Sequence, residues 1–430
     1  MGVVIIREVF GRVSLLGVIA FAAYLMAGPM CWAAMGFFMV KSRRRMRLRA
    51  GADAVPVDAL PPLTVLVPAR NEQERIGACL RSVLAQNYPN LQVVAVDDRS
   101  TDGTAAIIAA AAAADPRLKA ARVDAGELPA GWSGKNFALQ SAVAHATGQW
   151  LAFVDADVVL DPGALRTAVA LAASKRYDMA SFIPRTEKRS FLQDLAEPVL
   201  GGFVMGMYSA ALTNHDGHRD VAFANGQFML FRRSAYDAVG GHATVPGRCC
   251  EDVALARRAK AMGFRVRLLV GTDLATVAAF RSVPLLLRAW GRILYVIDPG
   301  NPWRVLGAAA FLLACCLSMY AVGGVALAEL IRGHAGALPW VAAAAAHFAL
   351  LTSFLALLYR WSAVRIASAL CFPVAAGLAL AAFFLALVNY VKGSVVWRET
   401  RYAQSTPLRD RLPKPFARRQ MPARRGHYVG

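Results

Sequence analysis

The chain has 430 residues, 57% of them hydrophobic, and a formal net charge of +20 at pH 7. With a mean hydropathy of +0.41 it is too apolar for an ordinary soluble enzyme and too long for one typical domain, so part of it is expected to lie in lipid. The basic residues are concentrated beside apolar segments, which favours anionic phospholipids as partners. The chain has no cysteine and histidine spacing of a zinc finger and no basic patch with interleaved aromatic residues, which argues against nucleic acid.

The first part of the chain predicts a membrane anchor. Residues 13–40 carry no charged side chain and are long enough to cross a bilayer of ~30 Å, whereas a signal peptide has an apolar core of roughly 7 to 15 residues. We therefore expect an uncleaved transmembrane anchor over residues 1–43 and a basic, flexible linker over 44–61. Lysine and arginine crowd residues 41–49, and the positive-inside rule places them in the cytoplasm. The chain is accordingly expected to be a multi-pass protein of the cell membrane, with the domain at 62–280 on the cytoplasmic side.

Residues 62–280 predict an α/β domain, because short apolar runs alternate with helical patterns. Strands are expected at 63–67, 91–96, 150–154, 179–183, 227–231 and 266–270. Helices are expected at 72–86, 103–114, 135–146, 163–174 and 252–262. Ligands of such sheets bind beyond the carboxyl ends of the strands, so the polar residues that follow the strands form the candidate site.

Polar residues follow the first two predicted strands. Residues 68–72 read Pro-Ala-Arg-Asn-Glu, and residues 97–104 read Asp-Asp-Arg-Ser-Thr-Asp-Gly-Thr. In the second segment, hydroxyl and carboxylate side chains can cap the helix that follows, and Gly103 can ease the turn. This structural role accounts for only part of the motif, because it leaves the adjacent Asp97 and Asp98 unexplained.

Two carboxylates follow the predicted strand at 150–154. Alternate residues of a strand share a face, so Asp155 and Asp157 are expected to act together. Mg²⁺ and Mn²⁺ prefer carboxylate, water and phosphate oxygens, which makes this pair a candidate metal site. The alternative is that the acids cap the helix that starts at residues 161–163 or are simply solvated, since Asp-x-Asp by itself is a weak indication.

Further polar clusters lie at helix starts and in a loop. Residues 131–135, Gly-Trp-Ser-Gly-Lys, are similar to a phosphate-binding helix start, although a glycine-rich turn before a helix is common. Glu251 and Asp252 also begin a helix, where the helix dipole favours acidic side chains whatever their function. His215 and His218 are spaced as metal ligands can be, but a polar loop rich in Asn, Gly and Asp is the favoured interpretation.

The last part of the chain predicts more membrane segments. Apolar stretches lie at 305–328, 337–358 and 366–391. We expect an interfacial segment at 281–304 and a membrane region of two to three helices at 305–391. The basic tail at 392–430 favours the cytoplasmic side, whereas three crossings would put it outside. One segment should therefore be interfacial or re-entrant, and the stretch that contains Pro373 and Gly377 is the favoured one.

Residues 198–213 are also uncharged and apolar. A crossing there would place Asp252 and Asp157 on opposite sides of the membrane and dismantle the candidate site. We therefore predict a helix that lies against the bilayer or against the sheet.

Taken in order, these motifs resemble those of the membrane-bound family 2 glycosyltransferases, which adopt a GT-A-type nucleotide-sugar-binding fold. The resemblance covers about residues 62–290 and includes 68–72, 97–103, 131–135, 155–157, 225–227, 240–241 and 251–252. Within the family the chain is most similar to enzymes that act on lipids, such as the hopanoid-associated, carotenoid and ceramide glycosyltransferases. The resemblance implies an inverting transfer of a sugar from a nucleotide-sugar donor, expected to be UDP-linked, to a lipid hydroxyl at the cytoplasmic membrane face.

The resemblance also implies roles for individual residues. Donor-binding residues would be Pro68, Ala69, Arg70, Glu72, Asp97, Asp98, Lys135, Asp155, Asn225, Gly226 and Gln227. Asp97 or Asp98 would bind the uridine ring, and Lys135 would lie by the nucleotide or diphosphate. Asp157, with help from Asp155, would hold Mg²⁺ or Mn²⁺ on the diphosphate, a charge-neutralising role that suits a metal. Asp252, beside Glu251, would be the general base for the acceptor hydroxyl.

Two departures from the family pattern matter, and the first of them argues against processive polymerisation of the cellulose or hyaluronan kind. Processive polysaccharide synthases carry a Gln-x-x-Arg-Trp motif, whereas residues 287–292 here read Leu-Arg-Ala-Trp-Gly-Arg. The usual Lys-Gly-Arg of the tail is replaced by Arg398, Glu399 and Thr400, which puts a substrate contact there in doubt. The alternatives are a polysaccharide synthase, a polyprenyl-phosphate glycosyltransferase and a catalytically inactive membrane scaffold.

Overall fold

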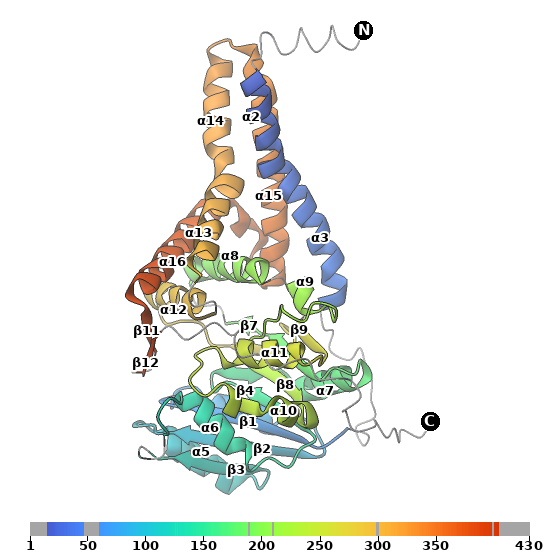
Figure 1. Cartoon of the computed structure of the whole chain (residues 1–430), viewed down its shortest axis with the longest axis vertical. Coiled ribbons are helices and arrows are strands. Elements are labelled where there is room, and N and C mark those ends of the chain that lie inside the picture. The colour runs from blue at the N-terminus through green and yellow to red at the C-terminus, as the bar shows by residue number, and fades with distance from the viewer. Residues whose placement is uncertain are drawn as a thin grey trace. The chain divides into compact units, whose positions relative to one another are not determined.

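The computed structural model describes residues 15–46, 60–124, 126, 128–187, 190–208, 210–297, 301–397 and 400–403. The chain divides into two compact units (Figure 1). One, the helical unit, comprises Met1–Met46, Lys188–Met207 and Ala279–Gly393. The other, the sheet unit, comprises Arg47–Glu187, Tyr208–Ala278 and Ser394–Gly430.

The sheet unit is built on a seven-stranded sheet with strand order β3-β2-β1-β4-β8-β6-β9. Its strands are β1 Leu63–Ala69, β2 Leu91–Asp98, β3 Leu118–Val123, β4 Trp150–Val154, β6 Met179–Ile183, β8 Phe228–Arg232 and β9 Val266–Val270. The first four in this order run parallel, and β8 is antiparallel to both of its neighbours. A small three-stranded sheet of β5 Val158–Leu160, β10 Ala275–Val277 and β7 Arg185–Thr186 accompanies it. The predicted α/β fold class is confirmed.

Helices cover both faces of this sheet. They are α4 Ile76–Leu84, α5 Thr104–Ala114, α6 Gly134–Val143, α7 Ala164–Ser174, α10 Arg233–Val239 and α11 Glu251–Ala261. Successive residues of β1 point to opposite faces, so Val65 packs in a core with α4, α5 and α7 while Leu66 packs in a second core with α6, α10 and α11. Where the parallel strands of such a sheet are buried on both faces, ligand-binding residues lie at the ends of the strands.

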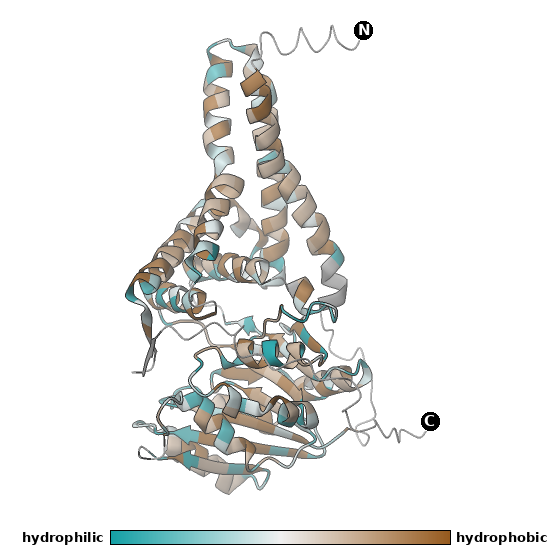
Figure 2. Cartoon of the chain, viewed as in Figure 1, coloured by the Kyte–Doolittle hydropathy of each residue, from teal (hydrophilic) through white to brown (hydrophobic). Residues whose placement is uncertain are grey.

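Among its described residues, the helical unit contains four helices that are long and apolar enough to cross a membrane. They are Leu15–Lys41, Pro302–Ile331, Ala335–Trp361 and Ile366–Lys392. The first is α2 Leu15–Leu25, η1 Met26–Met30 and α3 Cys31–Met46; the second is α13 Pro302–Phe311, η5 Leu312–Leu317 and α14 Ser318–Ile331. The third centres on α15 Leu338–Trp361, and the fourth joins η7 Ile366–Cys371 to α16 Phe372–Lys392. Figure 2 shows hydrophobic residues predominating along these helices, as expected of a membrane protein.

A polar node joins three of these helices. His347 on α15 is fully buried and lies 3.2 Å from the Tyr24 hydroxyl and 3.0 Å from the carbonyl oxygen of Cys315. Its ring packs so closely on Gly28 that a Cβ there would lie 2.5 Å from Nδ1. The Trp32 indole donates to the same Cys315 carbonyl, which lies in the π-helical turn η5. These contacts give His347 a hydrogen-bonded packing role between the helices.

Two further helices of this unit, α8 Phe191–Met207 and α12 Val283–Ile297, pack against α16. Gly291 of α12 permits the close approach, because a Cβ there would lie 2.8 Å from the Leu385 Cβ. The Asn389 carboxamide donates to the Gly291 carbonyl over 3.3 Å, and the Tyr390 hydroxyl donates to that of Leu294 over 3.4 Å. Figure 1 shows α16 ending beside α12.

The predicted strands and helices agree closely with the observed ones, apart from a few ends. The structure adds β3, an edge strand whose central residues are largely exposed, the short strands β5, β7 and β10, and the helix α10. Helix α4 begins at Ile76 instead of residue 72, and α6 ends at Val143 instead of residue 146. Most of the predicted linker at 44–61 and of the basic tail at 392–430, including Arg398 and Glu399, lies outside the described residues.

Candidate active site

The candidate site lies at the carboxyl ends of β1, β2 and β4. Because β1 and β2 are in parallel register, Ala69 is paired with Asp97 at the ends of the two strands. The loops that follow are also bonded to each other: the Glu72 amide donates to the Thr104 hydroxyl over 2.8 Å. The segments at 68–72 and 97–104 therefore form one continuous wall.

Asp97 and Asp98 are both buried at the end of β2. One Asp97 oxygen accepts from the Ser100 amide at 3.3 Å, and the other has no hydrogen-bond partner among the described residues, although the Arg122 Nε lies 3.7 Å away. Asp98 accepts from the Nε of Arg99 at 2.7 Å. Its other oxygen occupies the space where a side chain on residue 134 would begin, so only glycine fits at the start of α6.

Lys135 joins two acidic segments that are far apart in the sequence. Its Nζ lies 2.7 Å from an Asp155 oxygen and 2.8 Å from a Glu251 oxygen. Burial lowers the pKa of the Lys135 ammonium, but the Asp155 and Glu251 carboxylates outweigh this and hold the pKa well above its ordinary value. Lys135 is therefore a fixed cation that neutralises part of the negative charge of the site.

Asp157 has a longer ion-pair contact than Asp155. Its carboxylate is partly exposed and lies 3.7 Å from an Arg75 guanidinium nitrogen. Burial and the nearby charges of Asp155 and Glu72 raise the pKa of Asp157, against the opposing effect of Arg75 and Lys135. Mutual repulsion of this kind is relieved by a divalent cation, and Mg²⁺ commonly binds one or two carboxylates and completes its shell with water and substrate phosphates. The part of the chain that the structure describes contains no cluster of three or more His, Cys, Asp or Glu residues able to hold a metal by themselves.

Glu251 and Asp252 form the first turn of α11. An Asp252 oxygen accepts from the Val253 amide at 2.8 Å. Burial, and secondly the Glu251 carboxylate, raise the pKa of Asp252 to about 7. A carboxyl group tuned in this way can accept a proton near neutral pH, which is the requirement for a general base.

The turn at 225–227 links the two acidic pairs. The Gly226 amide donates to the Asp252 carboxylate, and the Asp155 amide donates to the Gln227 carbonyl over 3.2 Å. The turn is closed by the Gln227 amide, which donates to the Asn225 side-chain oxygen over 2.9 Å. Because β8 is antiparallel to β4, this turn before β8 lies at the same edge of the sheet as the residues after β4.

Sequence reasoning missed one residue that supports this turn. The Ser181 hydroxyl of β6 accepts from the Asn225 amide at 2.7 Å and donates to the Asn225 carbonyl at 3.0 Å. Ser181 is fully buried in an otherwise apolar strand. A polar side chain at a buried strand position was the available indication of such a role.

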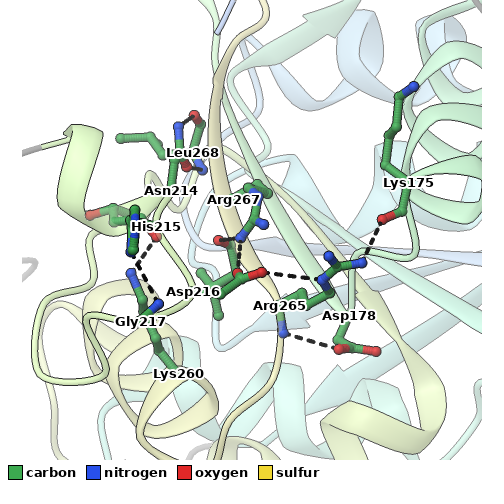
Figure 3. Close-up of polar contacts among 12 residues, drawn as sticks. Lys175, Asp178, Asn214, His215, Asp216, Gly217, Lys260, Arg265, Arg267 and Leu268 are labelled. Atoms are coloured by element: carbon green, nitrogen blue, oxygen red, sulfur yellow. Dashed lines mark hydrogen bonds and ion pairs between the residues drawn. The ribbon is translucent and has the colours of Figure 1, made fainter. Parts of the chain in front are cut away.

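The segment with His215 lies in a polar cluster with Asp216, Arg265 and Arg267 (Figure 3). Asp216 pairs with Arg267 at 2.6 Å and with Arg265 at 3.3 Å, while His215 Nδ1 accepts from the Gly217 amide. These contacts fasten a polar loop along β9, in agreement with the interpretation favoured from the sequence.

Residues 64–240 match a family model described as Glycosyl transferase family 2. The 4,4'-diaponeurosporenoate glycosyltransferase of Staphylococcus aureus strain MRSA252 is 28% identical over 273 residues, which are 60% of this chain and 69% of the relative. The sequence from strain USA300 is 28% identical over 271 residues, again 60% and 69%.

Solved structures that are similar to this chain include a mannosyltransferase, PcManGT from Pyrobaculum calidifontis, in complex with GDP-Man and Mn²⁺. It has a TM-score of 0.46 and 21% identity, over 78% of this chain and 98% of that one. S. aureus TarS in complex with UDP-GlcNAc has a TM-score of 0.38 and 15% identity, over 80% and 96%. Residues 64–240 thus match glycosyl transferase family 2, and this match together with the named relatives supports a glycosyltransferase.

Proposed function

We propose that this chain is an inverting glycosyltransferase that moves a sugar from a nucleotide-sugar donor, UDP-linked, to a lipid hydroxyl at the cytoplasmic face of the cell membrane. One observation carries the proposal: Lys135 holds Asp155 and Glu251 within ion-pair distance at 2.7 and 2.8 Å. Gly134, the residue before Lys135, packs on Asp98, and Asp252 follows Glu251, which supports one site for the groups that we propose for the nucleotide and for the acceptor.

The donor would lie along the wall made by residues 68–72 and 97–104. Asp97 and Asp98 are the candidates for the nucleoside base, and Asp97 has a buried oxygen without a hydrogen-bond partner among the described residues. Lys135 would bind the diphosphate, because a fixed cation complements its charge. The turn at 225–227 would close the sugar end of this site.

Mg²⁺ or Mn²⁺ would be held by Asp157 with Asp155. When bound, the metal would neutralise the charge that develops on the leaving diphosphate. Asp157 suits the role because its carboxylate is partly exposed and is repelled by neighbouring acids. This proposal concerns the two carboxylates alone, since donor phosphates and water would supply the remaining ligands.

Asp252 would take the proton from the acceptor hydroxyl at its carboxylate as the hydroxyl attacks the anomeric carbon. The bond from that carbon to the diphosphate breaks in the same displacement, which inverts the anomeric centre. The Gly226 and Val253 amides hold the carboxylate in place, and its raised pKa matches it to an acceptor at neutral pH.

A lipid acceptor fits the four apolar helices and a relative named for 4,4'-diaponeurosporenoate, a carotenoid. An enzyme fixed in a bilayer meets such an acceptor by diffusion in two dimensions. We propose a cytoplasmic catalytic domain at 62–280, an N-terminal anchor at 1–43 and an interfacial segment at 281–304. Anionic phospholipids would neutralise the basic residues that flank the membrane segments.

The test is to incubate membranes that contain the full chain with a panel of labelled nucleotide sugars and Mn²⁺ or Mg²⁺, and to identify the lipid product by mass spectrometry. We expect one glycolipid, and we expect Asp252→Asn to abolish it. Asp237→Asn is the matched control, because Asp237 is an exposed residue paired with Arg233 on α10 and should transfer normally.

Other outcomes would favour the alternatives. A ladder of products would indicate a polysaccharide synthase, and transfer to polyprenyl phosphate that survives Asp252→Asn would indicate that acceptor class. Neither transfer nor donor hydrolysis with any nucleotide sugar would indicate a non-catalytic scaffold that keeps the fold.

A further inference from the structure

Asn136 occupies an unusual position beside the candidate site. It is the third residue of α6, it follows Lys135, and its side chain is completely buried. Its Nδ2 lies 2.7 Å from the Val245 carbonyl oxygen and 3.0 Å from those of Pro246 and Arg248. One carboxamide therefore holds three carbonyls of a segment more than a hundred residues away.

The same two segments are in contact through their backbones. The Ser133 amide donates to the Pro246 carbonyl over 2.8 Å, and the Ser133 hydroxyl caps α6 by accepting from the Asn136 amide at 3.2 Å. A Cβ on Gly247 would lie 2.6 Å from the carbonyl oxygen of Gly131, so the chains approach more closely than a side chain would allow. The start of α6 and the segment at 245–248 behave as one unit.

The segment at 245–248 leads directly into the candidate catalytic pair. After Arg248 only two residues remain before α11 begins at Glu251. A displacement of this segment would therefore move the first turn of α11, which carries Glu251 and Asp252. At the other end of the connection, Lys135 is bonded to Glu251 itself at 2.8 Å.

We propose that Asn136 is a positioning residue that fixes Asp252 relative to the Lys135 end of the donor site. It acts through the backbone at 245–248 and touches neither donor nor acceptor. This inference rests on the proposed sugar transfer, because it assigns Asn136 a role in that reaction. It predicts that loss of the Asn136 carboxamide slows the chemical step and leaves donor binding intact.

The Asn136→Ala variant removes both donated hydrogens, and Asn136→Asp keeps the shape but turns an oxygen toward three carbonyl oxygens. We expect kcat to fall ~100-fold in both, because a displacement of about 1 Å at a reacting group has an effect of this order. KM for the donor and the affinity for UDP, with GDP as a second probe, should stay at the wild-type values. Asn136→Ser keeps one donor and should recover part of kcat.

Gln140→Ala is the matched control. Gln140 is on the same helix, one turn further on, and its Oε1 accepts from the exposed Ala243 amide over 3.1 Å. It connects α6 to the neighbouring turn without reaching residues 245–248, so kcat should be unchanged. Hydrogen exchange of the full chain gives an independent readout: amides at 245–252 should exchange faster in Asn136→Ala and at the wild-type rate in Gln140→Ala.

The outcomes separate this inference from the proposed function. Wild-type protein that transfers no sugar overturns the proposed function and, with it, the role assigned to Asn136. Wild-type transfer with unchanged kcat in both Asn136 variants overturns the inference alone. A parallel loss of kcat and UDP affinity, or a fall in thermal stability without faster exchange at 245–252, also overturns it, because it indicates a general structural role.

Discussion

At the scale of a single residue, Asp252 has a raised pKa, although its proposed role as a base requires the ionised form. Burial and Glu251 raise its pKa to about 7, so the ionised form that a base requires is disfavoured by the fold. The carboxyl group is mostly protonated below that pH and mostly ionised above it. We therefore predict that kcat/KM rises with pH through about 7 and then levels off, which a pH–rate profile will check.

The same pKa shift affects stability in the opposite direction. An unfolded Asp titrates near pH 4, so between about pH 4 and 7 the folded state binds more protons, and stability falls as the pH rises through that window. Asp252→Asn removes this titration and should raise the thermal midpoint at pH 8 while it abolishes transfer. A flat pH–rate profile together with an unchanged thermal midpoint would show that the pKa of Asp252 is not raised and that Asp252 is not the base.

A second prediction at the scale of single residues concerns Ser181 and the turn at 225–227. Its hydroxyl satisfies both the amide and the carbonyl of Asn225, and Ser181→Ala leaves these groups of the partly buried turn without that partner. Loss of two such bonds should reduce the free energy of unfolding by about 1–3 kcal/mol and lower transfer by loosening the turn at 225–227.

Denaturant unfolding of the detergent-solubilised full chain measures this change. Ser174→Ala is the control, since Ser174 is exposed at the end of α7 and its hydroxyl donates to the Leu171 carbonyl of the same helix. A loss of stability equal to that of the control would contradict the role of Ser181.

At the scale of elements, the strands at 150–154, 179–183 and 266–270 were predictable because each is a short apolar run between turn residues. The edge strand β3 was not, because Lys119 and its exposed neighbours break the apolar pattern. The acidic residues at the strand ends could be predicted as candidate site residues, because packing of the core does not require a charged side chain there. Asn136 and Ser181 act through backbone groups of distant segments, and local sequence carries no record of such partners.

The last apolar segment also belongs to this scale. η7 packs along α15, and α16 then packs on α8 and α12, the two helices predicted to lie along the membrane. Its end is bonded to α12 through Asn389 and Tyr390. We predict that α16 is re-entrant and that residue 392 is cytoplasmic, in agreement with the positive-inside rule for the basic residues that follow.

Single cysteines in a cysteine-free background will test this topology. An impermeant maleimide applied to intact cells should label a cysteine at Ala335, in the connection between α14 and α15, and leave one at Lys392 unlabelled until the cells are opened. External labelling at both positions would show that α16 crosses the membrane.

At the scale of the whole molecule, a sugar-transfer domain and a set of apolar helices belong to one chain. The helices keep the protein in one bilayer, and the acceptor that we propose lies in that same bilayer. A lipid with a large apolar body leaves a membrane slowly, because each buried methylene contributes about 0.8 kcal/mol to its retention. The enzyme should therefore glycosylate acceptors in its own membrane and ignore those in other membranes.

Reconstituted vesicles can measure this restriction. Vesicles with the full chain and an isotope-labelled acceptor are mixed with protein-free vesicles that carry the unlabelled acceptor, and the donor is added outside. We expect only the labelled acceptor to gain sugar. The transfer should come from the enzyme molecules whose sheet unit faces the outside of the vesicle. Mild protease that cuts the exposed sheet unit should remove this activity, since the donor does not cross the bilayer. Equal transfer to both acceptor pools would contradict a membrane-confined reaction and indicate an acceptor taken from solution.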